Sequence, residues 1–188
     1  MASTQVTTAT RLPASGRWEL DPNHSTVEFS ARHLGLSKVK GRFERFSAEI
    51  EVGESLADSR FEAVLDAASI DTRVDYRDQH LRSPDFLDVE RFNEIRFTSN
   101  RIEPVGEGRF DVSGDLTIRD ITKPATMAVE YHGEVEDPQA TTKRAGFSGS
   151  LVIDREAFGM TWNGAIEIGG FVGKKVKVEI EAEALLAA

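Results

Sequence analysis

The sequence predicts an all-β protein whose strands close into an antiparallel barrel, and three observations lead to this prediction. Apolar and polar residues alternate with a period of two through most of the chain, as in strands with one dry face and one wet face. Clusters of glycine, proline and aspartate separate these alternating segments. One segment, residues 75–87, does not alternate and predicts one or two short helices between strands.

About eight segments show the strand pattern. In chain order they are residues 17–21, 27–33, 46–52, 61–67, 110–118, 125–131, 147–153 and 176–184. In the last segment the apolar residues face away from a row of lysines and glutamates, which indicates a solvent-exposed outer face. The predicted turns are residues 21–23, 35–41, 53, 104–108 and 137–138.

Eight amphipathic antiparallel strands can close into a barrel, which leaves no exposed edge. A barrel of this size has room for its own side chains or for one small ligand. Two packed sheets would bury the same faces, and alternation alone does not separate the two architectures. Several inward positions are small and leave volume for bulky neighbours or for a ligand: Ala31, Ala48, Ala63, Ala67, Gly114, Gly149, Ala182 and Ala184.

The predicted helical segment carries a cluster of charges. The charged residues are Arg77, Asp78, His80 and Arg82. One interpretation makes the helix a lid whose polar side chains meet the head of a ligand. The favoured interpretation is a helix that plugs one end of the barrel, with its charges paired or solvated. The residues then expected to pack inward are Tyr76, Leu81, Phe86 and Leu87.

The composition limits the possible partners. A chain of 188 residues suits a single domain, with residues 1–16 as a flexible tail and residues 17–188 as the barrel. The absence of cysteine excludes disulfides and cysteine-based zinc sites. A formal net charge of −9 disfavours nucleic acid as a partner, and it disfavours electrostatic docking on anionic membranes.

The N-terminal residues lead us to expect a cytoplasmic protein. They lack the basic start and the apolar segment of a secretory signal. No apolar run approaches the length needed to span a bilayer, so we expect no stable membrane insertion.

His33 stands where the strand of residues 27–33 should place an apolar side chain. Its ring can bond to nearby backbone, contact the polar head of a ligand at the barrel mouth, or act as a base, and the sequence leaves these possibilities open. His24 lies beside Asp21 and Ser25, but a hydrolytic triad needs a geometry that one turn rarely supplies. No histidine spacing typical of a metal site occurs, so we predict neither a metal nor a cofactor.

Several short motifs follow one another along the chain. They are WELDPNHS at residues 18–25, FSARHLG at 29–35, GRF at 41–43, SIDT at 69–72, RDQHLRSPDF at 77–86, IRFTS at 95–99, GDLTI at 114–118, TKP at 122–124 and DREAFG at 154–159. In this order they make the chain resemble the YceI-like family from about residue 18 to residue 184. Asp120 departs from the pattern, because relatives often have glycine there, and this difference can alter one turn.

The resemblance implies an eight-stranded, lipocalin-like barrel that holds an isoprenoid chain or a quinone tail, and it makes a homodimer plausible. We therefore predict a non-catalytic protein that binds, sequesters or carries an isoprenoid-type lipid by burying its tail. The residues expected to bind the ligand are Phe29, His33, Phe46, Phe61, Phe97, Leu116, Phe147, Phe158 and Trp162.

Two alternatives remain open from the sequence. One is an enzyme that acts on a small apolar substrate with His24 or His33 as base. The other is a ligand-free stress or interaction module. A glycine-rich stretch at residues 164–173 predicts a mobile loop near the barrel mouth.

Overall fold

The computed structural model describes residues 12–139, 141–164 and 171–187. Within these ranges the chain forms strands β1 (Gly16–Leu20), β2 (Thr26–His33), β3 (Ser37–Phe43), β4 (Phe46–Val52), β5 (Arg60–Asp66), β6 (Ile70–Asp71), β7 (Glu94–Gly106), β8 (Arg109–Ile118), β9 (Ile121–Asp137), β10 (Thr142–Asp154) and β11 (Val172–Leu186). The α-helix of this part of the chain is α1 (Asp75–Arg82). Short 3₁₀ turns form at Pro22–His24, Leu56–Asp58, Ala67–Ser69 and Arg155–Phe158.

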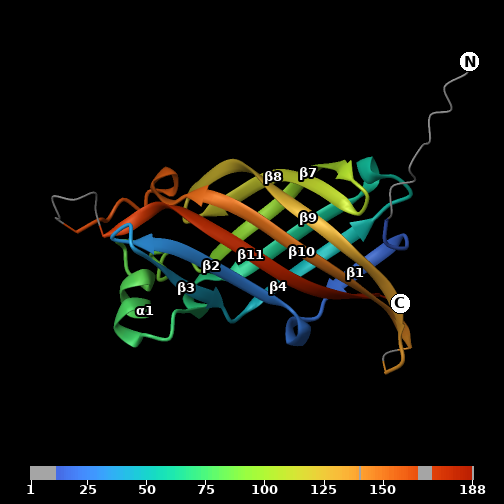
Figure 1. The fold of residues 1–188 in the computed structure, drawn as a ribbon, viewed down its shortest axis with the longest axis horizontal. Coiled ribbons are helices and arrows are strands. Elements are labelled where there is room, and N and C mark those ends of the chain that lie inside the picture. The colour runs from blue at the N-terminus through green and yellow to red at the C-terminus, as the bar shows by residue number, and fades with distance from the viewer. Residues whose placement is uncertain (1–11, 140, 165–170, 188) are drawn as a thin grey trace, which may run out of the picture.

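The predicted closed barrel is confirmed (Figure 1). Its ring of eight strands runs β1-β4-β5-β7-β8-β9-β10-β11, and β1 pairs with both β4 and β11 to close it. Each of these pairings is antiparallel. Closure decides against the two-sheet alternative, because pairing β1 to β11 leaves the ring without an edge.

Strand β11 shares one edge between two partners. Its residues Ala184–Leu186 pair with β1, whereas its residues from Val172 to Glu181 pair with β2. β2 in turn pairs with β3, and β3 pairs with the short β6. The barrel therefore has two different ends. We call them the α1 end, where β2 and β10 finish and β3 and β11 begin, and the β1 end, where β1 begins and β11 finishes.

The eight predicted strands all form, but three further strands, β3, β6 and β7, were not predicted, and β7 takes a place in the barrel ring that the prediction gave to β2. β3 occupies most of the stretch predicted as a turn at residues 35–41, and β7 continues to Gly106 through part of the turn predicted at residues 104–108. Gly41 misled the turn prediction. It faces inward in β3, where an added Cβ would collide with the Phe29 ring and lie 2.7 Å from the Thr72 methyl group. This glycine makes space between packed side chains and does not form a turn.

The N-terminal side of the barrel is fixed by Trp18, whose side chain is fully buried. Its indole Nε1 donates to the Ala14 carbonyl oxygen at 2.9 Å, and the Ala14 amide donates to Glu134 on β9 at 2.8 Å. Residues 12–16 of the predicted tail thus contact the barrel. Residues 1–11 of that tail, and residues 165–170 of the predicted loop, lie outside the described residues.

Helix α1 lies beside the α1 end of the barrel (Figure 1). Phe86 and Leu87, just after it, are buried, and Leu81 packs against the same core, as predicted. The prediction for Tyr76 is wrong, because this side chain is 81% exposed. Tyr76 precedes Leu81 by five positions, which places it about 140° away around the helix. Only one helix forms in the described part of this segment, and turns occupy the residues around Pro84.

The charges near α1 are paired, as the favoured interpretation expected. Buried Asp78 accepts a hydrogen bond from the Thr72 amide at 2.9 Å. Arg77 donates to the Thr72 hydroxyl at 2.7 Å and to its carbonyl oxygen at 2.9 Å. Arg82 donates to the carbonyl oxygens of Ala68 and Ile70 at 2.8 and 2.6 Å. These bonds attach the helix to the barrel and leave the lid interpretation without support.

Candidate functional site: two apolar chambers

The barrel interior contains two adjoining chambers. The β1 chamber, toward the β1 end, has a cavity volume of about 140 Å³, and the α1 chamber, toward the α1 end, has one of about 180 Å³. The residues that line both are Val27, Phe61, Ala63, Leu65, Met127 and Ile180. Because the same residues line both, the two chambers lie next to each other along the barrel interior.

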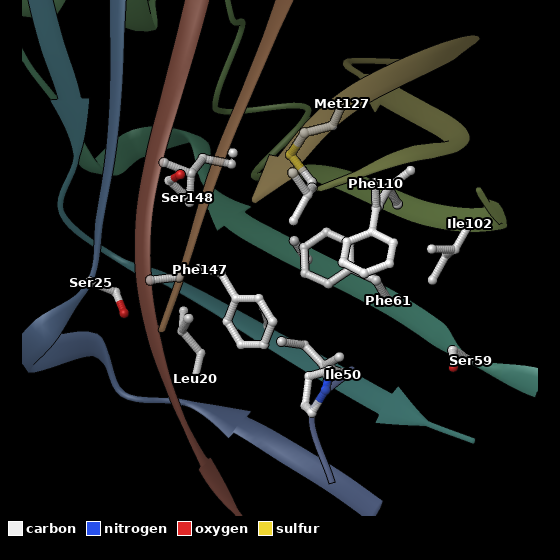
Figure 2. Close-up of a pocket in the computed structure, with 18 of the residues that line it drawn as sticks. Leu20, Ser25, Ile50, Ser59, Phe61, Ile102, Phe110, Met127, Phe147 and Ser148 are labelled. Atoms are coloured by element: carbon white, nitrogen blue, oxygen red, sulfur yellow. The ribbon is translucent and has the colours of Figure 1, made fainter. Parts of the chain in front are cut away.

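The β1 chamber is lined by the inward-facing residues of several strands. Phe46, Ile50, Phe110 and Phe147 line it from β4, β8 and β10, and Figure 2 shows Ile50, Phe110 and Phe147 around the same space as Phe61. Its polar lining residues are Ser25, Ser47, Ser59 and Ser148.

The two buried serines of this chamber have partners. Ser25 donates to the Asp21 carbonyl oxygen at 2.7 Å, and Ser59 donates to the Ser55 carbonyl oxygen at 3.0 Å. The β1 chamber therefore offers apolar contacts and little hydrogen bonding to a guest.

The α1 chamber is more apolar still. Phe29, Phe97 and Leu116 line it from β2, β7 and β8, while Leu81 and Phe86 approach from α1 and the turn after it. Among the described residues that line it, Arg155 is charged and the others have apolar side chains.

Arg155 is 2% exposed, and its guanidinium is surrounded by backbone oxygen. It donates to the carbonyl oxygens of Trp162, Val172 and Gly173 at 3.0, 3.0 and 3.1 Å, and also to that of Met160. Burial, which disfavours the charged form, lowers the pKa of the guanidinium. Most of its N–H groups are thus engaged in holding the irregular segment that follows β10 against the start of β11. It is poorly placed to bind a guest.

Sequence reasoning missed Arg155 as part of the interior. A charged residue that follows a strand usually lies in solvent, and no spacing rule distinguishes this one. The available signal was its position in the motif at residues 154–159, directly before the buried Phe158.

The nine residues predicted to bind a ligand fall into two groups. Those that line the chambers are Phe29, Phe46, Phe61, Phe97, Leu116 and Phe147. Those that do not are His33, Phe158 and Trp162. Trp162 packs its ring on His80, Phe86 and Phe171 with centroids 4.6, 5.6 and 6.4 Å apart. The half-buried His33 ring lies 5.9 Å from the Phe171 ring at the α1 end.

The residues of the proposed enzyme alternative do not assemble into a hydrolytic triad. His24 Nδ1 lies 2.8 Å from Asp21 Oδ2, but the ring is largely exposed. Ser25 gives its hydroxyl proton to backbone oxygen and accepts from the Glu183 amide at 3.0 Å, so no described bond joins it to His24. A nucleophile needs a base within hydrogen-bond reach. Across the described ranges, no three His, Asp or Glu side chains are grouped as metal ligands.

A network of ion pairs at the β1 end connects three strands and the turn at Pro22–His24. Arg144 on β10 contacts Asp21, Asp137 and Glu183 at 2.7, 2.7 and 2.8 Å. The hydrogen bond from Arg144, with a smaller contribution from His24, lowers the pKa of Asp21 to about 2. The network is structural, because it lies where the partner strand of β11 changes from β1 to β2.

Fold and interior together define a closed β-barrel with an apolar cavity. The chain belongs to the YceI-like family, because the family model for the YceI-like domain matches residues 18–184. A UPF0312 protein of Vibrio vulnificus is 40% identical over 136 residues, which is 72% of this chain and 71% of the relative. A UPF0312 protein of Staphylococcus aureus is 38% identical over 165 residues, 87% of this chain and 94% of the relative.

Solved structures share the fold. The Campylobacter jejuni YceI protein superposes with a TM-score of 0.71 at 26% identity, covering 84% of this chain and 90% of that one. Burkholderia cenocepacia BcnA gives a TM-score of 0.76 at 23% identity, covering 87% and 98%. A polyisoprenoid binding domain from Saccharophagus degradans gives 0.68 at 16% identity, covering 90% and 98%. None of the helices in the described ranges is long and apolar enough to cross a membrane.

Proposed function

We propose that this protein binds an isoprenoid-type lipid, with its polyprenyl or quinone tail inside the barrel, and carries or sequesters it without chemical change. The observation that supports this most directly is the interior itself: two adjoining chambers with apolar walls. The structural similarity to a domain named for polyisoprenoid binding points in the same direction.

The chemistry of the walls favours a tail over a polar guest. A buried polar group without a hydrogen-bond partner costs free energy, and Ser25, Ser59 and Arg155 already spend their donors on the protein. An apolar chain needs no such partners. Each five-carbon unit that leaves water contributes roughly 4 kcal/mol before the costs of association, at ~0.8 kcal/mol per carbon.

The polar head of such a lipid belongs outside the chambers. The proposed contact of His33 with the head stays a prediction, since its ring lies at the α1 end and outside the chamber walls. A non-catalytic role is consistent with the dispersed positions of His24 and His33. The proposal includes a cytoplasmic location and leaves room for a homodimer.

The experiment that tests this function is native mass spectrometry of the freshly purified protein, together with mass analysis of its organic extract. We expect a stoichiometric apolar adduct that leaves on denaturation. A protein that stays bare, even after incubation with quinones and polyprenyl lipids, would contradict the proposal.

Two variants locate the tail. Ala63 lines both chambers, so Ala63→Phe should fill shared space and reduce retention of the adduct while adding no charge. Phe147→Lys places a cation in the β1 chamber and should abolish retention there. The matched control is Val152→Lys on the same strand, because Val152 is 61% exposed and faces outward. Equal retention by all three folded variants would exclude an internal site.

A further inference from the structure

The tip of the β2–β3 hairpin exposes two leucines at the α1 end. Leu36 is 80% exposed and Leu34 is 38% exposed. The Leu36 amide donates to the His33 carbonyl oxygen at 2.9 Å, and the two residues between them, Leu34 and Gly35, have φ values of 52° and 72°. Two positive φ values in a two-residue turn define type I′.

A leucine is an unusual choice for the first central position of this turn. Positive φ favours glycine, asparagine and aspartate, because a Cβ with a branched side chain crowds the backbone. Leu34 therefore adopts a positive φ that is unfavourable for leucine, and its side chain also exposes apolar surface. Residues held in disfavoured conformations occur preferentially at functional positions.

Basic residues cover the outer face of the sheet next to this tip. The strand register places Lys177 of β11, Ser30 of β2 and Lys40 of β3 side by side, and it places Arg32 opposite Lys38 one step closer to the tip. These four cations are exposed. Lys177 pairs with Glu179 at 2.6 Å, whereas Lys38 and Lys40 form no ion pair within the described residues. The whole chain carries a net charge of −9, so this concentration of positive charge is local.

We propose that the hairpin tip docks the protein on an anionic lipid bilayer. Leu34 and Leu36 enter the boundary between head groups and acyl chains, while Arg32, Lys38 and Lys40 contact the head-group phosphates. Apolar side chains at a tip with cations behind them are the chemistry that an anionic membrane surface selects.

The net negative charge of the whole molecule does not prevent such docking, because most of its acidic residues lie too far from the tip to act on the bilayer. At physiological salt a charge acts over about 8 Å, so a bilayer in contact with the tip experiences the nearby cations rather than the average of the molecule. Helix α1, at the same end in Figure 1, adds the exposed Tyr76, and Val74 just before the helix is exposed as well.

Docking at this tip would bring the bilayer next to the lipid cavity. A role of docking in lipid transfer rests on the proposed function. The outward side of the hairpin carries the cations, and its inward residues Phe29 and Ala31 line the α1 chamber. The Leu34 amide also donates to the Phe171 carbonyl oxygen at 3.0 Å, one residue before β11. A bilayer that holds the tip thus holds the wall of the chamber that would receive a lipid tail.

The test is cosedimentation of the full chain with vesicles. We expect binding to vesicles of phosphatidylcholine mixed with phosphatidylglycerol, little binding to phosphatidylcholine alone, and a decrease with added salt. Leu36→Ser should weaken binding roughly tenfold, because it removes one apolar anchor. Lys38→Gln and Lys40→Gln should each weaken binding roughly fivefold.

Matched controls come from the rest of the surface. Val135→Ser removes an apolar side chain that is 64% exposed at the β1 end, and Arg101→Gln removes a cation that is 68% exposed on β7. Both should bind vesicles like the unaltered chain. Vesicle binding that the controls weaken as much as the tip variants would overturn the proposal, as would failure of the unaltered chain to bind mixed vesicles.

Three further outcomes separate the explanations. Light scattering that shows a dimer lost in Leu36→Ser, without vesicle binding, would assign the tip to a second copy of the chain and overturn membrane docking. An apolar adduct in the organic extract without vesicle binding would likewise overturn docking but leave the proposed function intact. Tip-dependent vesicle binding by a protein that carries no lipid would support docking and overturn the proposed function.

Discussion

Replacement of Arg155 by methionine is the sharpest test of how the α1 end is held together. Four backbone carbonyl oxygens, those of Met160, Trp162, Val172 and Gly173, accept from its guanidinium. Methionine fills similar volume in the α1 chamber wall but donates no hydrogen bond.

The magnitude follows from those acceptors. Each buried acceptor that loses its donor costs about 1–3 kcal/mol. Part of this loss is offset, because the variant no longer has to keep a charge away from water. Because four acceptors lose their donors and this cost is offset only in part, we expect a net loss of about 3–5 kcal/mol in the free energy of unfolding. For a chain of this length that corresponds to a decrease in Tm of roughly 6–20 °C.

Urea denaturation and thermal unfolding followed by circular dichroism measure this change. Arg155→Lys should recover little of the lost stability. The planar guanidinium reaches four carbonyl oxygens in different directions, and a single ammonium group cannot contact all of them. Arg101→Met is the surface control and should stay within about 0.5 kcal/mol of the unaltered chain. A loss below about 1 kcal/mol for Arg155→Met, or full recovery by lysine, would show that these hydrogen bonds do not hold the α1 end.

Three further predictions concern stability. Arg144 lowers the pKa of Asp21 from 3.8 to about 2, so the contribution of Asp21 to stability is complete above about pH 5 and is lost as the pH falls through 2. Asp21→Asn should cost about 1–2 kcal/mol at pH 7 and flatten the acid limb of a pH–stability curve, and an unchanged limb would contradict this. Gly114→Ala should destabilise the barrel by about 1–3 kcal/mol in urea, because its Cβ would collide with the Thr98 carbonyl oxygen, and a neutral effect would show that β7 and β8 can separate at no cost. Leu34→Asn should raise the free energy of unfolding by about 0.5–1 kcal/mol, because asparagine accepts positive φ, and should weaken vesicle binding, because it removes an apolar side chain from the tip. A decrease in stability would mean that Leu34 packs on the barrel.

Much of the fold could be predicted from period-two alternation, because a barrel with a dry inside and a wet outside imposes that period on each strand. β8 and β11 show it clearly, since their outward positions are charged or polar. β3 was missed because Gly35 precedes it and Gly41 lies within it. Of these two glycines only Gly35 lies in the turn, and a single sequence does not distinguish a glycine that bends the chain from one that yields space to a neighbouring ring.

The candidate site was predicted less completely. The inward phenylalanines Phe29, Phe61 and Phe147 follow from alternation, and the structure places them in the chamber walls. Trp162 has no such periodicity to locate it, and it packs on His80 and Phe86 instead of lining a chamber. Its place depends on tertiary contacts among α1, the turn after it and the segment after β10, which local patterns do not encode.

The wall shared by the two chambers gives the barrel a means of discriminating tails by length. Phe61 and Met127 stand where the chambers meet, so a short tail fits on one side of them, whereas a longer tail must displace them to continue. Methionine adapts its three torsions at little cost, but a phenylalanine ring turns only if its neighbours give way. Affinity should therefore rise with tail length in two stages rather than smoothly. Between the stages we expect a plateau, where the free energy gained from added carbons only offsets the cost of displacing Phe61 and Met127.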